Sequence, residues 1–167
     1  MSIEVLGIDH IYINVSDLRR SEGFYDKVMK ALGFRKGAGP EHCEPCIIDG
    51  DPCFHYYNQH LQYTIRQSRN PNNKHDPFSP GLNHICFQLS DREQVDSAAN
   101  ELRGVGIDAS TPCLYPEYAS DYYAAYFADP DGICLEIVNQ CGIRKTIREQ
   151  WANLDRFVNP LQHLKDK

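Results

Sequence analysis

The sequence is short of basic residues and contains no long apolar run. Its 17 Lys and Arg residues are outnumbered by 23 Asp and Glu residues, which gives a net charge of −6. A nucleic-acid-binding surface needs clustered Lys and Arg, so this balance argues against a nucleic-acid partner. No apolar stretch approaches the length of a membrane span, and the first residues, MSIEVLGIDH, lack the basic and apolar regions of a signal peptide. We therefore expect no nucleic-acid or membrane partner.

The cysteines do not form the paired pattern of a disulfide framework. There are seven of them, an odd number, and they are scattered along the chain. Free thiols in a reduced compartment fit this pattern better, so we expect a cytoplasmic protein. A chain of 167 residues is long enough for one domain with a hydrophobic core.

An internal repeat is the strongest signal present. Residues 7–17, GIDHIYINVSD, align with residues 81–91, GLNHICFQLSD, at an offset of 74 positions. Each copy reads as a strand, then an amphipathic helix, then short strand-like runs. The repeat predicts an α+β fold of tandem βαβββ modules, at about 5–67 and 81–140. Residues 68–80, rich in Asn, Pro and Ser, read as the linker inside a single domain spanning 1–140.

Local signals mark the ends of several elements. Ser16 or Asp17 can cap the first helix, and Ser90 with Glu93 forms a capping box for the second. The turn-forming run DPDG at 129–132 precedes the last strand. Beyond the repeat, residues 141–167 are expected to form an amphipathic helical extension, because apolar residues recur there at helical spacing: Ile147, Trp151, Leu154 and Phe157.

Three residues of the repeat predict a metal site. His10 and His84 occupy the same register of a duplicated strand, and Glu136 interrupts the apolar run ICLEIV, where an unpaired buried carboxylate would be costly. Two imidazoles and one carboxylate form a three-ligand set that suits Fe, Mn, Zn or Ni and leaves positions open for water or substrate. The alternative is the ordinary polar face of a half-buried sheet.

These motifs, with the DPDG turn that leads to Glu136, resemble the vicinal oxygen chelate superfamily over about residues 5–140. That superfamily includes glyoxalase I, fosfomycin- and bleomycin-resistance proteins and extradiol dioxygenases. The resemblance implies a glyoxalase-like fold, in which paired modules form a curled mixed sheet around a metal cavity. It also implies a homodimer.

The resemblance raises the question of a fourth ligand. Glyoxalase I members usually supply one from the last strand of the first module, often a Glu. The repeat offset applied to Glu136 leads to Gln62, and Thr64 or Arg66 would be the equivalent if the loop lengths differ. None of these is a carboxylate, so the position holds a weak neutral ligand or water. Glu136 is then the remaining candidate for the catalytic base.

The other candidates are substrate-binding residues. Tyr12, Tyr118 and Tyr122 could orient a substrate oxygen or donate a proton, and Arg66 could hold an anionic group. The alternatives are packing for the tyrosines and a solvated strand end for the arginine. Histidines without a repeat partner are expected on the surface or in loops: His42, His55, His60, His75 and His163.

The sequence thus predicts a metal-dependent glyoxalase-family enzyme, a lyase, an isomerase or a dioxygenase, acting on a small substrate chelated through oxygen atoms. Two alternatives remain. One is a metal-independent protein that sequesters a small molecule, as bleomycin-resistance members do. The other is a dimeric scaffold with a vestigial site.

Overall fold

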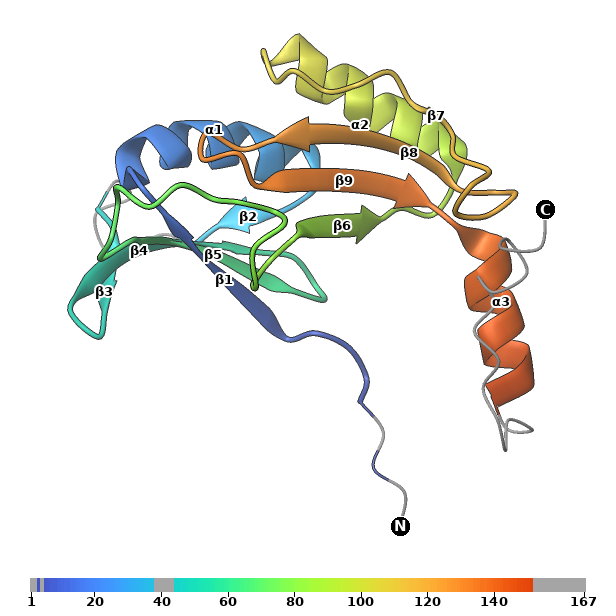
Figure 1. The fold of residues 1–167 in the computed structure, drawn as a ribbon, viewed down its shortest axis with the longest axis horizontal. Helices are drawn as coiled ribbons and strands as arrows, with labels where there is room; N and C mark the ends of the chain where they lie inside the picture. The colour runs from blue at the N-terminus through green and yellow to red at the C-terminus, as the bar shows by residue number, and fades with distance from the viewer. Residues whose placement is uncertain (1–2, 4, 38–43, 152–167) are drawn as a thin grey trace. The chain divides into compact units, whose positions relative to one another are not determined.

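The computed structural model describes residue 3 and residues 5–37 and 44–151. The chain divides into two compact units (Figure 1). Unit 1 comprises residues 1–76 together with the turn at 129–133, and unit 2 comprises residues 77–128 and 134–167. Each unit contains one copy of the repeat, so the expected α+β class of paired modules is confirmed.

Unit 1 is a five-stranded mixed sheet with one helix. Its strands run in the order β1-β5-β4-β2, β3 pairs with β4 as well, and only β1 and β5 are parallel. The elements are β1 (His10–Val15), α1 (Leu18–Ala31), β2 (Arg35–Lys36), β3 (Cys46–Ile48), β4 (Asp51–Tyr57) and β5 (Gln62–Gln67).

Unit 2 repeats the plan with four strands in the order β6-β9-β8-β7. The first strand again pairs in parallel with the last, and the other pairs are antiparallel. The elements are β6 (His84–Gln88), α2 (Arg92–Gly104), β7 (Cys113–Leu114), β8 (Tyr123–Ala128), β9 (Cys134–Asn139) and α3 (Cys141–Gln150).

Equivalent aspartates begin the two repeat helices. Asp17 accepts a hydrogen bond from the Arg20 backbone N–H, and Asp91 accepts one from the Gln94 backbone N–H. The predicted cap at Ser90 was therefore wrong by one residue: a carboxylate is available next to it, and the Ser90 hydroxyl donates to that carboxylate instead.

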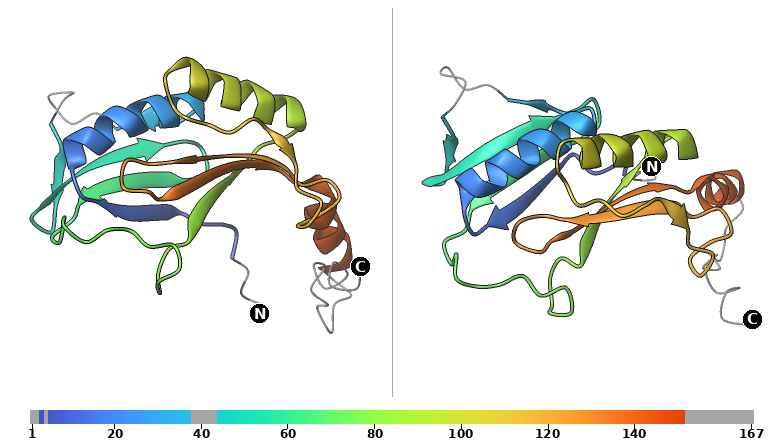
Figure 2. Two further views of the ribbon diagram at one scale, coloured as in Figure 1. Left: turned by 45° about the horizontal axis from the view of Figure 1, so that its top comes forward. Right: turned by 90° about the horizontal axis from the view of Figure 1, so that it is seen from above.

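In each unit the helix covers the apolar face of its sheet, as the strand alternation predicts (Figure 2). In unit 1, Tyr25, Val28 and Met29 of α1 are fully buried, and so is Ile65 of β5. In unit 2 the buried stripe of α2 packs against Leu135 and Ile137 of β9. Full burial of each aliphatic side chain contributes about 1.5–3 kcal/mol.

The predicted turn at 129–132 forms and belongs to unit 1. Asp129 Oδ1 accepts from the backbone N–H groups of Asp131 and Ile133, and Gly132 adopts a positive φ of 87°. Asp129 Oδ2 accepts a hydrogen bond from the buried Tyr25 hydroxyl at 3.0 Å. The turn is therefore held to α1 by a hydrogen bond between buried groups.

The end of the chain is only partly described. The predicted C-terminal helix begins at Cys141 as α3 and ends at Gln150, and the rest of the expected extension, with Leu154 and Phe157, lies outside the described residues. Within the described part of the chain, the cysteines are free thiols. No helix in that part combines the length and apolarity that crossing a membrane requires.

Candidate metal centre

Strand pairing in unit 2 carries His84 and Glu136 on the face of the sheet opposite α2. Cys86 pairs with Glu136 and Glu136 with Tyr126, so these side chains share that face, and His84 precedes Cys86 by two residues on the same strand. The neighbouring residues Leu135 and Ile137 point into the core. The alternation read from the sequence is therefore confirmed in this unit.

His84 and Glu136 lie close enough to share an ion. The His84 Nε2 atom is 3.5 Å from the Glu136 Oε2 atom. Two ligands at about 2.0–2.2 Å from one tetrahedral ion would be about 3.4 Å apart, so the observed separation fits a shared metal. Glu136 is 1% exposed and His84 is 43% exposed, which leaves the imidazole side open. This donor pair therefore fits the predicted metal.

Tyrosines surround the Glu136 carboxylate. The Tyr122 hydroxyl donates to Glu136 Oε1 at 2.5 Å. Burial and the hydrogen bond with Glu136 raise the pKa of both Tyr122 and Tyr126 above the usual tyrosine range. Both phenols therefore stay protonated near neutral pH and act as hydrogen-bond donors beside the carboxylate.

Tyr118 belongs to the same aromatic cluster but lies farther out. Its ring stacks on Tyr115 with centroids 6.2 Å apart and lies 5.1 Å from the ring of Tyr122. It is about half exposed. A hydrogen bond with Cys113 and burial raise the pKa of Tyr115 to about 12. The predicted substrate residues Tyr118 and Tyr122 are thus neighbours in this unit, and only Tyr122 is bonded to the carboxylate.

Each repeat histidine is oriented by the residue before it. His84 Nδ1 is 2.6 Å from Asn83 Oδ1, and His10 Nδ1 is 2.9 Å from Asp9 Oδ2. Both partners are oxygen atoms that can accept a hydrogen bond from Nδ1, which would leave Nε2 as the metal-binding atom. The two copies of the repeat therefore orient their imidazoles in the same way.

His10 lies in unit 1, at the start of β1. Its ring meets the ring of Tyr12 edge to face at 5.5 Å, and Gln62 is its partner across the strand pair. Within neither unit do three His, Cys, Asp or Glu side chains of the described residues gather as a metal site. The three-residue site with His10, His84 and Glu136 therefore remains a prediction.

Strand register identifies the position equivalent to Glu136. In unit 2, His84 pairs with Cys134, and Glu136 follows two residues later. In unit 1, His10 pairs with Gln62, so the equivalent of Glu136 is Thr64 rather than Gln62. His10 and its partner Gln62 are 62 − 10 = 52 positions apart, whereas His84 and Cys134 are 134 − 84 = 50 apart, and this difference of two shifts the sequence offset. The Gln62 amide instead donates to Thr64 Oγ1 at 3.0 Å and lies 3.4 Å from the Tyr12 hydroxyl.

His55 was wrongly expected at the surface. It lies on β4, is 8% exposed, and its Nδ1 is 2.8 Å from the hydroxyl of the fully buried Thr64. Its Nε2 is 3.5 Å from Cys53 Sγ. Burial lowers the pKa of His55 below the usual histidine value, so the neutral form is favoured. Residues 53–56 of β4 are all buried, so strand alternation gave no signal that singled out His55.

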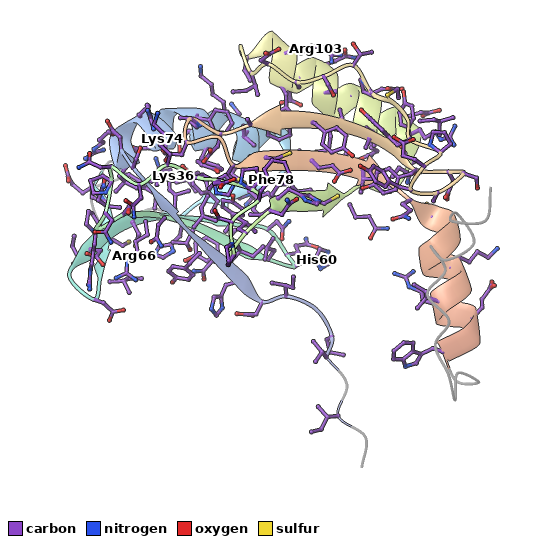
Figure 3. The ribbon with its side chains drawn as sticks, viewed as in Figure 1. Lys36, His60, Arg66, Lys74, Phe78 and Arg103 are labelled. Atoms are coloured by element: carbon purple, nitrogen blue, oxygen red, sulfur yellow. The ribbon has the colours of Figure 1, made fainter. Side chains whose placement is uncertain are left out.

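Arg66 forms an ion pair with Asp51, which Arg69 also contacts. The two arginines hold the pKa of the Asp51 carboxyl below its usual range. Figure 3 places Arg66 and His60 toward opposite ends of the sheet of unit 1. Arg66 is four residues from Gln62 along β5, which is about 13 Å. These contacts leave Arg66 a weak candidate for holding a substrate anion beside His10.

Comparisons with known proteins agree with this architecture. The family model named Glyoxalase/Bleomycin resistance protein/Dioxygenase superfamily matches residues 7–137. The uncharacterized protein YqjT of Bacillus subtilis is 26% identical over 132 residues, covering 77% of this chain and 95% of the relative.

Two solved structures share the fold at lower identity. A lactoylglutathione lyase from Agrobacterium tumefaciens has a TM-score of 0.54 at 18% identity, covering 83% of this chain and 96% of that one. A mutant fosfomycin resistance protein from Listeria monocytogenes, complexed with Mn(II), has a TM-score of 0.60 at 16% identity, covering 85% and 98%.

Proposed function

Because the chain belongs to the Glyoxalase/Bleomycin resistance protein/Dioxygenase superfamily, we propose that it is a metal-dependent enzyme of that family. In this proposal His10, His84 and Glu136 hold one divalent ion, Fe, Mn, Zn or Ni, and the substrate is a small molecule that binds through oxygen atoms. The bound ion would supply Lewis-acid stabilisation of negative charge on those oxygens.

The separation of 3.5 Å between His84 Nε2 and Glu136 Oε2 carries the proposal. A solvent-facing glutamate would be exposed, whereas this carboxylate is almost completely buried beside an imidazole. The matching hydrogen bonds of His84 with Asn83 and of His10 with Asp9 support a shared role for the two imidazoles. One of the solved relatives was crystallised with Mn(II), which is consistent with this donor set.

The remaining residues act on the proton and the substrate. The Tyr122 hydroxyl donates a hydrogen bond to Glu136 Oε1. This hydrogen bond orients the carboxylate and leaves Oε2 facing His84. Glu136 is the proposed catalytic base, and the phenol of Tyr118 lies at the edge of the same cluster, where it can orient a substrate oxygen. In unit 1, Tyr12 lies beside His10 and is the corresponding substrate candidate.

Thr64 in the position equivalent to Glu136 narrows the reaction class. A second carboxylate would provide a separate base for isomerisation, and threonine cannot replace it. The proposal is therefore a two-histidine, one-carboxylate enzyme, a lyase or dioxygenase in which Glu136 is the only carboxylate of the site. We also propose that the protein forms a homodimer and that it acts in the cytoplasm.

Metal content tests this proposal directly. The purified chain, dialysed after loading with Mn(II) or Zn(II), should retain about one ion per chain. His84→Ala should lose it, and His60→Ala, which removes an exposed histidine outside the site, should keep it. Metal-free wild-type protein after loading would instead support the alternative, a metal-independent protein that binds a small molecule.

A further inference from the structure

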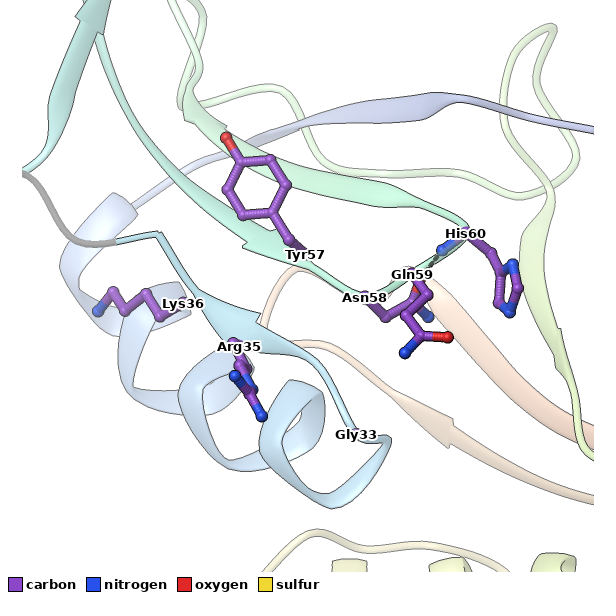
Figure 4. Close-up of a pocket in the computed structure, with 7 residues that line it drawn as sticks. All are labelled: Gly33, Arg35, Lys36, Tyr57, Asn58, Gln59 and His60. Atoms are coloured by element: carbon purple, nitrogen blue, oxygen red, sulfur yellow. Dashed lines mark hydrogen bonds between the residues drawn. The ribbon is translucent and has the colours of Figure 1, made fainter.

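A second candidate binding site lies in unit 1, at the end of the sheet where β2 faces the β4–β5 hairpin. The cavity has a volume of about 600 Å³, within the range of small-molecule sites. It lies between the bend at Gly33, the edge strand β2 and the hairpin, and the residues that matter here are Arg35, Lys36, Asn58, Gln59 and His60 (Figure 4). The lining includes no carboxylate.

Arg35 is the arginine of unit 1 whose side chain has no ion-pair partner among the described residues. Each of the other four is ion-paired: Arg19 with Glu22, Arg20 with Asp131, and both Arg66 and Arg69 with Asp51. The side chain of Arg35 forms no hydrogen bond or ion pair with any described residue, although Asp26 borders the neighbouring cavity. The Asp26 carboxylate is occupied by the Tyr56 hydroxyl and Lys36. The unpaired guanidinium is the one that lines the cavity.

Lys36 contributes its stem rather than its charge. Its Nζ atom lies 2.5 Å from Glu22 Oε1 and 2.9 Å from Asp26 Oδ1, and it sits 4.3 Å from the centre of the Phe54 ring. These contacts hold the ammonium group against α1, and the two carboxylates neutralise its charge. The positive charge available to a ligand in the cavity is therefore that of Arg35.

The hairpin opposite Arg35 presents hydrogen-bond donors. Asn58 Oδ1 accepts from the backbone N–H groups of His60 and Leu61 at 2.8 and 2.7 Å, so the turn is fixed and the Asn58 amide nitrogen is left as a donor. The Gln59 amide and the His60 ring form no side-chain hydrogen bond with a described residue. In Figure 4, Arg35 and Gln59 approach the space beside Gly33, and Tyr57 points away from it.

We propose that this cavity binds an oxyanion, a phosphate or carboxylate group, free or as part of a small organic molecule. A planar guanidinium can hold such a group with two parallel hydrogen bonds, and the hairpin donors can complete the shell. The site would be separate from the proposed metal residues, since its lining contains none of them. It therefore does not depend on the proposed enzymatic function.

The test uses metal-free protein and inorganic phosphate, followed by NMR spectra of the ¹⁵N-labelled chain. Shifts should be confined to Gly33, Arg35 and the hairpin residues 58–60. Arg35→Gln should weaken phosphate binding about tenfold or more, because it removes the charged donor. Lys74→Gln, which removes an exposed charge of the same unit outside the cavity, should leave binding unchanged.

A second variant guards against a folding defect in Arg35→Gln. Gln59→Glu places a negative charge on the exposed hairpin and should also weaken phosphate binding about tenfold or more, while the spectrum of the rest of unit 1 stays the same. Tighter binding of phenyl phosphate than of phosphate would identify an organic ligand, and equal binding a free anion. Phosphate binding that is absent, or unchanged in Arg35→Gln, or spread equally over exposed lysines would overturn the proposal.

Discussion

His84 at the start of β6 and Glu136 in the middle of β9 meet across a parallel strand pair, with Nε2 and Oε2 3.5 Å apart. His84 pairs with Cys134, and Glu136 lies two residues farther along β9, so both side chains are on the same face of the sheet. The Glu136 carboxylate is buried, with an imidazole on one side and two phenols on the other. This arrangement is the basis of the proposed metal site, and most of the functional proposal depends on it.

Replacement of Glu136 by glutamine should abolish metal binding and preserve the fold. Glutamine has nearly the same shape, and its carbonyl oxygen can still accept the Tyr122 proton, but it lacks the ligand charge. We expect the dissociation constant for Zn(II) to rise by more than about 100-fold, since loss of an orienting residue alone costs about 10–100-fold. Isothermal titration calorimetry with circular dichroism measures both effects. Unchanged affinity would remove Glu136 from the ligand set.

Tyr122→Phe should weaken the metal site without removing a ligand. The change deletes the hydrogen bond to Glu136 Oε1, so the carboxylate becomes less well oriented, and affinity should fall by about 10–100-fold. Tyr118→Phe is the matched control, because no hydrogen bond of Tyr118 with Glu136 is formed. Equal effects of the two substitutions would show that the hydrogen bond is not what orients the carboxylate.

His55 should make the stability of the protein depend on pH. Its pKa in the folded state is below the value of about 6.5 expected for the unfolded chain. Above that pH both states are neutral and the stabilising contribution is complete. As the pH falls below it, the unfolded chain takes up the proton first, and the free energy of unfolding decreases.

Urea denaturation of His55→Gln between pH 7.5 and 5 tests this expectation. The variant should lose part of the pH dependence that the wild type has, whereas His60→Gln, which alters an exposed histidine, should keep all of it. If the free energy of unfolding changed with pH to the same extent in the wild type and in His55→Gln, burial would not lower the pKa of His55.

Tyr25→Phe should lower the free energy of unfolding by about 1–3 kcal/mol. The Tyr25 hydroxyl donates to Asp129 and accepts from Tyr63 at 3.3 Å, and all three residues are buried. Loss of the hydroxyl leaves the Asp129 carboxyl, whose pKa is already raised by burial, with one donor fewer. Chemical denaturation at pH 7 measures the change.

Tyr123→Phe provides the comparison for that measurement. Its hydroxyl donates to Asp96 at 2.8 Å, but this hydrogen bond is exposed, so its loss should change stability by less than about 0.5 kcal/mol. Equal effects of the two substitutions would contradict the importance of burial at Asp129.

The sequence predicted the parts of the fold that depend on repetition and periodicity. Alternation placed His84 and Glu136 on one sheet face and Leu135 and Ile137 on the other, and the matching segments predicted two modules with the same strand pairing. These features follow from the period of two along a strand, which any residue of the strand reports. The cap of the first helix was narrowed to Ser16 or Asp17 from a local signal, and Asp17 is the residue that forms it.

The failures lie where distant segments decide. A constant offset led to Gln62, with Thr64 or Arg66 as the alternatives for unequal loop lengths. The span from β1 to β5 is two residues longer than that from β6 to β9, so Thr64 holds the equivalent position. His55 has no counterpart in the second copy, and its burial depends on contacts with Thr64 and Cys53 across and along the sheet. The Arg66–Asp51 pair likewise joins β5 to β4, and no local pattern reports it.

The central claim is that His10, His84 and Glu136 bind one metal ion, and a crystal grown with Zn(II) tests it most directly. Anomalous scattering at the zinc edge should give one peak per chain, about 2.0–2.2 Å from the Nε2 atoms of two histidines, His10 and His84, and from a carboxylate oxygen of Glu136. A peak at other residues, or no peak in protein that is otherwise folded, would contradict the claim.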